Sequence, residues 1–74
     1  MLLSQVKKDT SCTIKQVLAV GEVLSRLNSL GVSVGRRVTV KGTSIFNSSI
    51  MISVNGRLVA IRQALADKIV VNYA

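Results

Sequence analysis

Two apolar runs that flank the dipeptide Asn55-Gly56 constrain the fold of this chain more than any other feature. Asn-Gly tolerates the two positive φ angles of a type I′ turn, so residues 50–61 are predicted to form a β-hairpin with a two-residue loop. Such a loop fixes the register of the two strands. The predicted pairs are Val54 with Arg57, Ser53 with Leu58, Ile52 with Val59, Met51 with Ala60, and Ile50 with Ile61.

Both faces of this hairpin are apolar. Because side chains alternate along a strand, one face is predicted to carry a row of five residues, namely Ile50, Ile52, Val54, Val59 and Ile61. The opposite face carries Met51, Leu58 and Ala60. A hairpin with one solvated face does not need this second apolar row. Met51 and Leu58 therefore have two interpretations, as contacts for a partner or as core residues packed under a neighbouring element.

The remaining elements follow from strand alternation, helical periodicity and glycine positions. They are a strand over Thr10–Leu18 with a bulge or bend, a helix over Glu22–Leu30, a strand over Arg36–Lys41, a polar loop over Gly42–Ser49, one helical turn over Arg62–Asp67, and a strand over Lys68–Tyr73. The 74 residues are too few for more than one domain, so residues 1–74 are predicted to form a single, mainly β unit. This order suits a small, strongly bent barrel of about five strands, whose closure would protect the sheet edges.

The predicted helix has one apolar stripe and a clear end. Val23, Leu27 and Leu30 recur at helical spacing, and Leu24 widens the stripe. Gly31 follows the last periodic residue, where a left-handed cap is expected. Arg26, Asn28 and Ser29 are predicted to lie on the other side of the helix.

The side chains that carry catalysis and metal binding are scarce. The chain has no histidine, and its thiol and carboxyl groups are limited to Cys12, Asp9, Glu22 and Asp67. A transition-metal site normally needs three or four such ligands close together, and a nucleophile needs a base. We therefore expect no enzyme activity, no cofactor and no metal site. Cys12 is expected to fill the core, and a chain with a single cysteine fits a reducing cytoplasm.

The net charge of +7 favours an anionic partner, which can be a nucleic acid, an acidic protein or the inner leaflet of a membrane. A nucleic-acid-binding barrel that places Lys7, Lys8, Arg36, Arg37 and Lys41 on phosphates is retained as an alternative. It is not favoured, because the only aromatic residues are Phe46 and Tyr73 and single-strand binders stack bases on several rings. No apolar stretch is long enough for a spanning helix or a secretory signal.

Several short motifs together resemble one family. They are Arg26-Leu27-x-x-Leu30-Gly31-Val32-x-Val34-Gly35, then Val38-x-Val40, Ile52-x-Val54-x-Gly56, Leu58-x-Ala60-Ile61-Arg62 and Ala66-x-x-Ile69-x-Val71. In this order and spacing they are similar to ferrous iron transport protein A (FeoA), from about Leu3 to Val71. One departure is the Gly42–Ser49 segment, which lacks the proline and additional glycine that are common there in the family.

The resemblance implies an SH3-like barrel in the cytoplasm, at most peripheral to the inner membrane. It also implies an accessory role beside ferrous iron transport protein B (FeoB), a membrane transporter with a cytoplasmic G domain. The same barrel forms the C-terminal domain of metal-dependent repressors of the diphtheria toxin repressor type, so a free-standing version of that domain is a second alternative. The expected partner contacts are Phe46, Met51 and Leu58, with Arg36, Arg37 and Lys41. Weak self-association through the apolar hairpin face is a further expectation.

Overall fold

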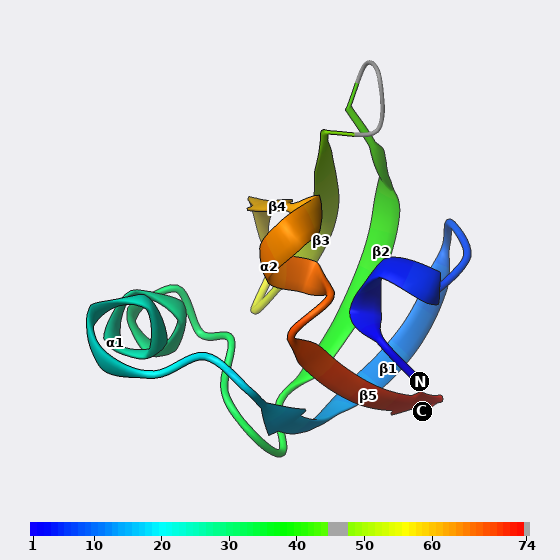
Figure 1. Ribbon diagram of the computed structural model, residues 1–74. Coiled ribbons are helices and arrows are strands. Elements are labelled where there is room, and N and C mark those ends of the chain that lie inside the picture. The colour runs from blue at the N-terminus through cyan, green and yellow to red at the C-terminus, as the bar shows by residue number, and fades with distance from the viewer. Residues whose placement is uncertain (45–47, 74) are drawn as a thin grey trace.

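Five antiparallel strands form one strongly bent sheet in the computed structural model, which describes residues 1–44 and 48–73 (Figure 1). The strands are β1 (Thr10–Val17), β2 (Arg37–Thr43), β3 (Ser49–Val54), β4 (Arg57–Arg62) and β5 (Ile69–Tyr73). The helices are the 3₁₀ turn η1 (Leu3–Gln5), the helix α1 (Gly21–Ser29) and the single turn α2 (Gln63–Ala66). The predicted mainly β fold, with one short helix and one helical turn, is confirmed.

The β3–β4 hairpin has the predicted turn and register. Asn55 and Gly56 both have positive φ, at 53° and 79°, as a type I′ turn requires. All five predicted pairs are present, and a sixth joins Ser49 to Arg62. On the inner face Ile52 is completely buried, whereas Leu58 on the outer face is 62% exposed. The turn thus decides which apolar row of the hairpin enters the core.

The core consists of aliphatic side chains and Cys12. Its largest fully buried members are Leu3, Ile14, Leu27, Ile50, Ile52, Ile61, Ile69, Val32, Val38, Val54 and Val71. Burial of one such side chain contributes about 1.5–3 kcal/mol. Branched aliphatic side chains suit the inner surface of a bent sheet, and no aromatic residue among residues 1–44 and 48–73 is buried in this core.

Two bulges bend the long strands. In β1 the register to β5 shifts between Ile14 and Gln16, which confirms the predicted irregularity. In β2 the register to β3 shifts between Val40 and Gly42, and Gly42 pairs with Met51. The predicted loop over Gly42–Ser49 is therefore too long, because β2 extends to Thr43 and β3 begins at Ser49. Glycine inside a strand often marks a bulge of this kind, so Gly42 belongs to β2 and does not begin the loop.

The two outer strands of the sheet are β4 and β5, and they differ in how their edges are covered. Leu2 forms a bridge with Val70, and the backbone N–H of Val71 donates to the carbonyl oxygen of Met1 at 2.8 Å. The N-terminal segment therefore covers the edge of β5, which the sequence pattern did not predict. Among residues 1–44 and 48–73 no ladder joins β4 to β5, so the sheet stays open there and α2 spans the gap (Figure 1).

The C-terminus of α1 is capped as predicted and contacts the tip of the hairpin. The N–H of Val32 donates to the carbonyl of Leu27 at 2.9 Å, and the N–H of Gly31 donates to Asn28 at 3.0 Å, which together form a Schellman motif. Gly31 has a φ of 88°, and a Cβ placed there would lie 3.0 Å from Cγ1 of Val54. The close approach therefore fixes the distance between this end of α1 and β3.

Substitution of Gly31 tests this contact. We expect Gly31→Ala to lower the free energy of unfolding by about 2 kcal/mol, because the positive φ and the clash with Val54 both act. Gly35→Ala is the matched control, since Gly35 has a φ of 89° but nothing within 4 Å of its Cβ position. The free energy of unfolding of this control, measured by urea unfolding, should fall by only about 1 kcal/mol. Equal losses for the two variants would contradict a tight packing of the helix end.

Candidate functional site

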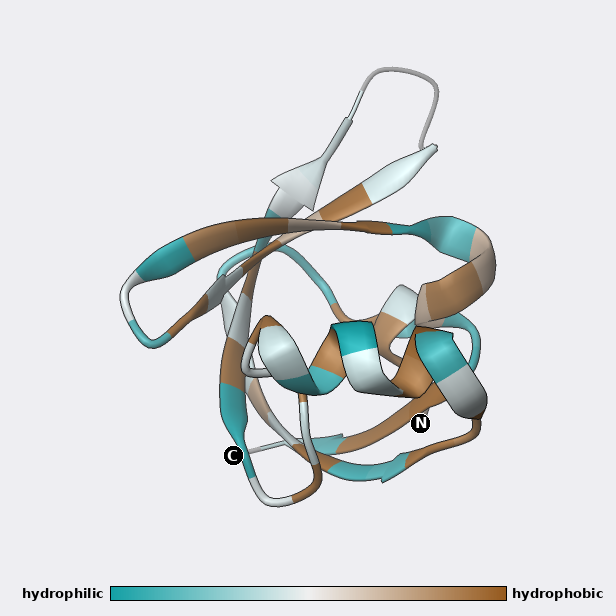
Figure 2. Cartoon of the chain, turned by 90° about the vertical axis from the view of Figure 1, so that its left-hand side faces the viewer, coloured by the Kyte–Doolittle hydropathy of each residue, from teal (hydrophilic) through white to brown (hydrophobic). Residues whose placement is uncertain are grey.

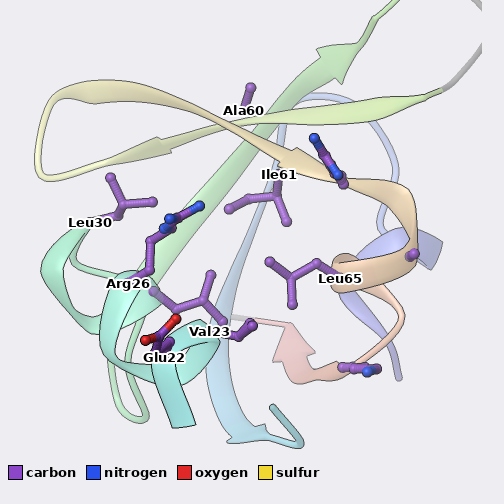
Figure 3. Close-up of a pocket in the computed structure, with 11 residues that line it drawn as sticks. Glu22, Val23, Arg26, Leu30, Ala60, Ile61 and Leu65 are labelled. Carbon is purple, nitrogen blue, oxygen red and sulfur yellow. The ribbon is translucent and has the colours of Figure 1, made fainter. Parts of the chain in front are cut away.

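A cleft of about 490 Å³ lies between α1 on one side and β4 with α2 on the other (Figure 3). Figure 2 shows α1 lying below β4 and α2, with apolar residues of the hairpin above it. Volumes of about 300–1,000 Å³ are typical of binding clefts. The lining residues are Glu22, Val23, Arg26, Leu27, Leu30, Ala60, Ile61, Arg62, Ala64, Leu65 and Lys68.

The apolar part of the lining comes from both walls. Val23 belongs to α1, and Leu30 lies at the C-terminal end of this helix. Ile61 and Leu65 point toward them from β4 and α2 (Figure 3). Ile61 is buried, but Val23 is 47% exposed and Leu30 is 39% exposed. The cleft therefore presents apolar surface to solvent.

The apolar stripe of α1 is buried only in part. Of the residues in α1 only Leu27 is buried, at 1% exposure. The helix stands to the side of the barrel (Figure 1), so Val23 and Leu30 form a wall of the cleft. Periodicity identifies an apolar face but does not distinguish burial in a core from exposure in a cleft, so Val23 and Leu30 were missed as candidate site residues.

The polar groups of the cleft are mostly basic. Arg26 from α1, Arg62 at the end of β4 and Lys68 after α2 border the apolar lining, and Glu22 is its only acidic residue. Among the described residues these three basic groups form no ion pair, and Arg26, Arg62 and Lys68 are all exposed. The cleft is thus suited to an apolar segment that carries negative charge.

The predicted contact residues lie around the hairpin and not inside the cleft. Leu58 is exposed on the outer face of β4, and Met51 is half-buried on the same face of β3. Because Met51 pairs with Ala60, which borders the cleft, the outer face and the cleft adjoin along β4. Phe46 lies outside the described residues.

The predicted basic residues are divided between two places. Arg36 and Arg37 are exposed beside the hairpin tip, where Nη1 of Arg36 donates to Oδ1 of Asn55 at 2.9 Å. Together with Ser33, Val34 and Gly35 they line a second, shallow depression of about 410 Å³. Lys41 is exposed further along β2, beside the bulge, and does not join them.

The titratable groups that the sequence singled out lie apart. Across residues 1–44 and 48–73 no three Cys, Asp or Glu side chains come together. Cys12 is completely buried, and this burial raises the pKa of its thiol. Asp67 accepts a hydrogen bond from the hydroxyl of Ser4. No helix within the described ranges has the length and apolar content needed to cross a bilayer.

Comparisons with known proteins agree with the fold. The model of the FeoA domain matches residues 1–73. This chain belongs to the FeoA family. No curated protein sequence matches it significantly.

Among solved structures, this FeoA chain resembles the FeoA protein from Chlorobium tepidum, with 29% identity and a TM-score of 0.92, over 99% of this chain and 70% of that one. An iron uptake regulatory protein (FeoA) matches with 24% identity and a TM-score of 0.88, over 100% of this chain and 96% of the other. The manganese regulator SloR contains the same fold at 16% identity and a TM-score of 0.86, over 100% of this chain but 34% of its own. The implied SH3-like fold is confirmed.

The outer hairpin face can be tested first for its effect on folding. Leu58→Asp should lower the free energy of unfolding by less than about 1 kcal/mol, because the side chain is 62% exposed and an edge strand tolerates charge. Ile61→Asp is the matched control on the inner face of the same strand and should unfold the protein. Thermal unfolding followed by circular dichroism distinguishes the two. Unfolding of Leu58→Asp would assign Leu58 to the core and exclude it as a contact residue.

The raised pKa of Cys12 gives a pH dependence with a definite sign. Below the ordinary pKa of a thiol, Cys12 is neutral in both states, so its contribution to stability is constant. As the pH rises above that value, the unfolded chain releases the proton first, and the free energy of unfolding falls until the raised native pKa is passed. Urea unfolding between neutral and alkaline pH should therefore show a steeper decline for the wild type than for Cys12→Ala. Parallel declines would contradict the burial of the thiol.

Proposed function

We propose that this FeoA protein serves ferrous iron uptake as a small accessory protein, which docks on the cytoplasmic part of FeoB and regulates or assembles the transporter. Family membership supports a role in iron uptake, and the observation that carries docking is the cleft, where exposed apolar side chains lie inside a basic border. Exposed apolar patches with a polar border are typical of protein interaction sites. In this proposal the protein acts by binding in the cytoplasm, and iron is the cargo of the transporter.

The docking surface in this proposal consists of the cleft together with the outer face of the hairpin. Leu58 and Met51 extend the apolar area of the cleft along β4 and β3. Arg36 and Arg37 add positive charge at the hairpin tip, and Lys41 would extend the contact at the other end of the hairpin. Phe46, which lies outside the described residues, is retained as a proposed contact. The net charge of +7 supports an acidic protein surface, close to the anionic inner leaflet of the membrane.

The test is an amide chemical-shift titration of the labelled protein with the soluble cytoplasmic domain of FeoB. We expect shifts that cluster on α1, β4 and α2. Val23→Asp should weaken binding by about tenfold or more, because it places a negative charge among the apolar side chains and repels an acidic partner. The fold should survive, since Val23 is 47% exposed.

Val20→Asp is the matched control for this substitution. Val20 is 79% exposed, lies outside the cleft lining and occupies the N-cap of α1, where aspartate is a favourable residue. Its affinity for the FeoB domain should equal that of the wild type. Shifts confined to surfaces remote from α1 and β4, or equal losses in the two variants, would contradict docking at the cleft. The absence of any shift would contradict the cytoplasmic domain as the partner.

A further inference from the structure

The outer edge of β4 is the edge of the sheet whose backbone groups are not paired with another segment of the described chain. Val54 and Arg57 flank a two-residue turn and therefore form a hydrogen-bonded pair, and such pairs recur at every second residue of an antiparallel ladder. Arg57, Val59 and Ile61 consequently direct their backbone groups to β3. The N–H and C=O groups of Leu58 and Ala60 point away from the sheet. Within residues 1–44 and 48–73 no backbone hydrogen bond to them is present.

This edge differs from its counterpart on β5. There the N-terminal segment supplies a carbonyl to Val71 and a bridge to Val70, so that edge is already paired. On β4 the side chain of Leu58 is 62% exposed and no segment of the described chain covers it. A row of free donors and acceptors on an accessible strand is a template for one more strand.

We infer that β4 binds an extended, acidic segment of a partner protein as a sixth strand of the sheet. This inference rests on the proposed function, because it specifies how a partner occupies the cleft. Main-chain hydrogen bonds to Leu58 and Ala60 hold the segment, and its side chains select it.

The cleft lies where one row of the added side chains falls. A new strand lies about 4.8 Å from β4, and its side chains alternate between the two faces of the sheet. The row on the inner side extends over the cleft, toward Ile61, Leu65 and Val23 (Figure 3). The row on the outer side lies next to Leu58 and Ala60. An apolar inner row therefore meets the apolar lining of the cleft, while an acidic outer row stays in solvent near Arg62, which shares the face of Leu58 and Ala60.

The charge around β4 distinguishes the two candidates for the added strand, which are an acidic segment of a partner and a second copy of this chain. Arg57 and Arg62 stand at the two ends of β4, and Arg26 and Lys68 border the cleft, whereas Glu22 is the one acidic residue among the cleft-lining positions. A second copy of this chain paired through β4 would bring like charges together, and like charges across a ladder are destabilising. An acidic segment instead neutralises them. The best ligand is an extended segment in which Asp or Glu alternates with Val, Ile or Leu.

The probe for this inference is a blocked peptide, Glu-Val-Asp-Ile-Glu-Val-Glu, added to the full labelled chain. Hydrogen exchange of the individual amides is followed by NMR. In the free protein the amides of Leu58 and Ala60 should exchange quickly, because they have no partner. With saturating peptide their exchange should slow by about tenfold or more. Chemical-shift changes in the cleft without this protection would overturn strand addition.

Two controls distinguish binding through main-chain hydrogen bonds from binding through side-chain contacts. The same peptide can be methylated at alternate amide nitrogens in two registers, both of which keep its charge and side chains. The register that methylates the nitrogens facing β4 cannot pair with this edge and should lose binding, whereas the other register should keep it. Ala60→Pro removes an outward N–H at a position where an edge strand tolerates proline. It should weaken the binding of the peptide without unfolding the protein. Equal affinity for the unmethylated peptide and for both methylated registers would overturn the inference, whether or not Ala60→Pro folds.

The remaining outcomes distinguish this inference from the proposed function. If the FeoB domain binds at the cleft and leaves the amides of Leu58 and Ala60 unprotected, the proposed function stands and strand addition is wrong. If the peptide protects both amides and the FeoB domain does not bind, strand addition stands and the partner is wrong. Protection that depends on protein concentration, without peptide, would mean that a second copy occupies the edge.

Discussion

The structure depends on the two-residue turn at Asn55 and Gly56. Its two positive φ angles allow one register between β3 and β4, and a shift by one residue would exchange the inner and outer faces of one strand relative to the other. The same register determines which backbone groups of β4 stay unpaired. The turn also presents Val54 to the end of α1, so the position of the helix relative to the hairpin follows from it.

Elements with strong local signals could be predicted from the sequence. The hairpin, its register, the cap at Gly31 and the irregularity in β1 each depend on the residues that form them. The extension of β2 through Gly42 was missed, because a bulge depends on the partner strand. The pairing of Met1 and Leu2 with β5 was missed for a similar reason, since it joins segments far apart in the chain.

The candidate site was predicted less well than the fold. Charge and apolar content on the hairpin indicated a binding surface, and Leu58 is exposed as a contact residue must be. The cleft itself depends on how far α1 stands from β4, which is a tertiary property. A stripe containing Val23 and Leu30 would look the same whether the helix lay flat on the sheet or stood beside it. Amphipathic pattern therefore predicts which face is apolar, and packing decides what that face contacts.

The pairing at β5 also places the two ends of the chain. Met1 contacts Val71, and Tyr73 pairs with Cys12, so both ends emerge beside β5, at the edge of the sheet opposite β4 (Figure 1). A linker attached at either end leads away from the cleft. Two or more such units can therefore be joined in tandem, or one can be fused to a larger protein, without obstructing the open edge. Tethering the protein to a surface through either terminus would likewise leave α1 and β4 accessible.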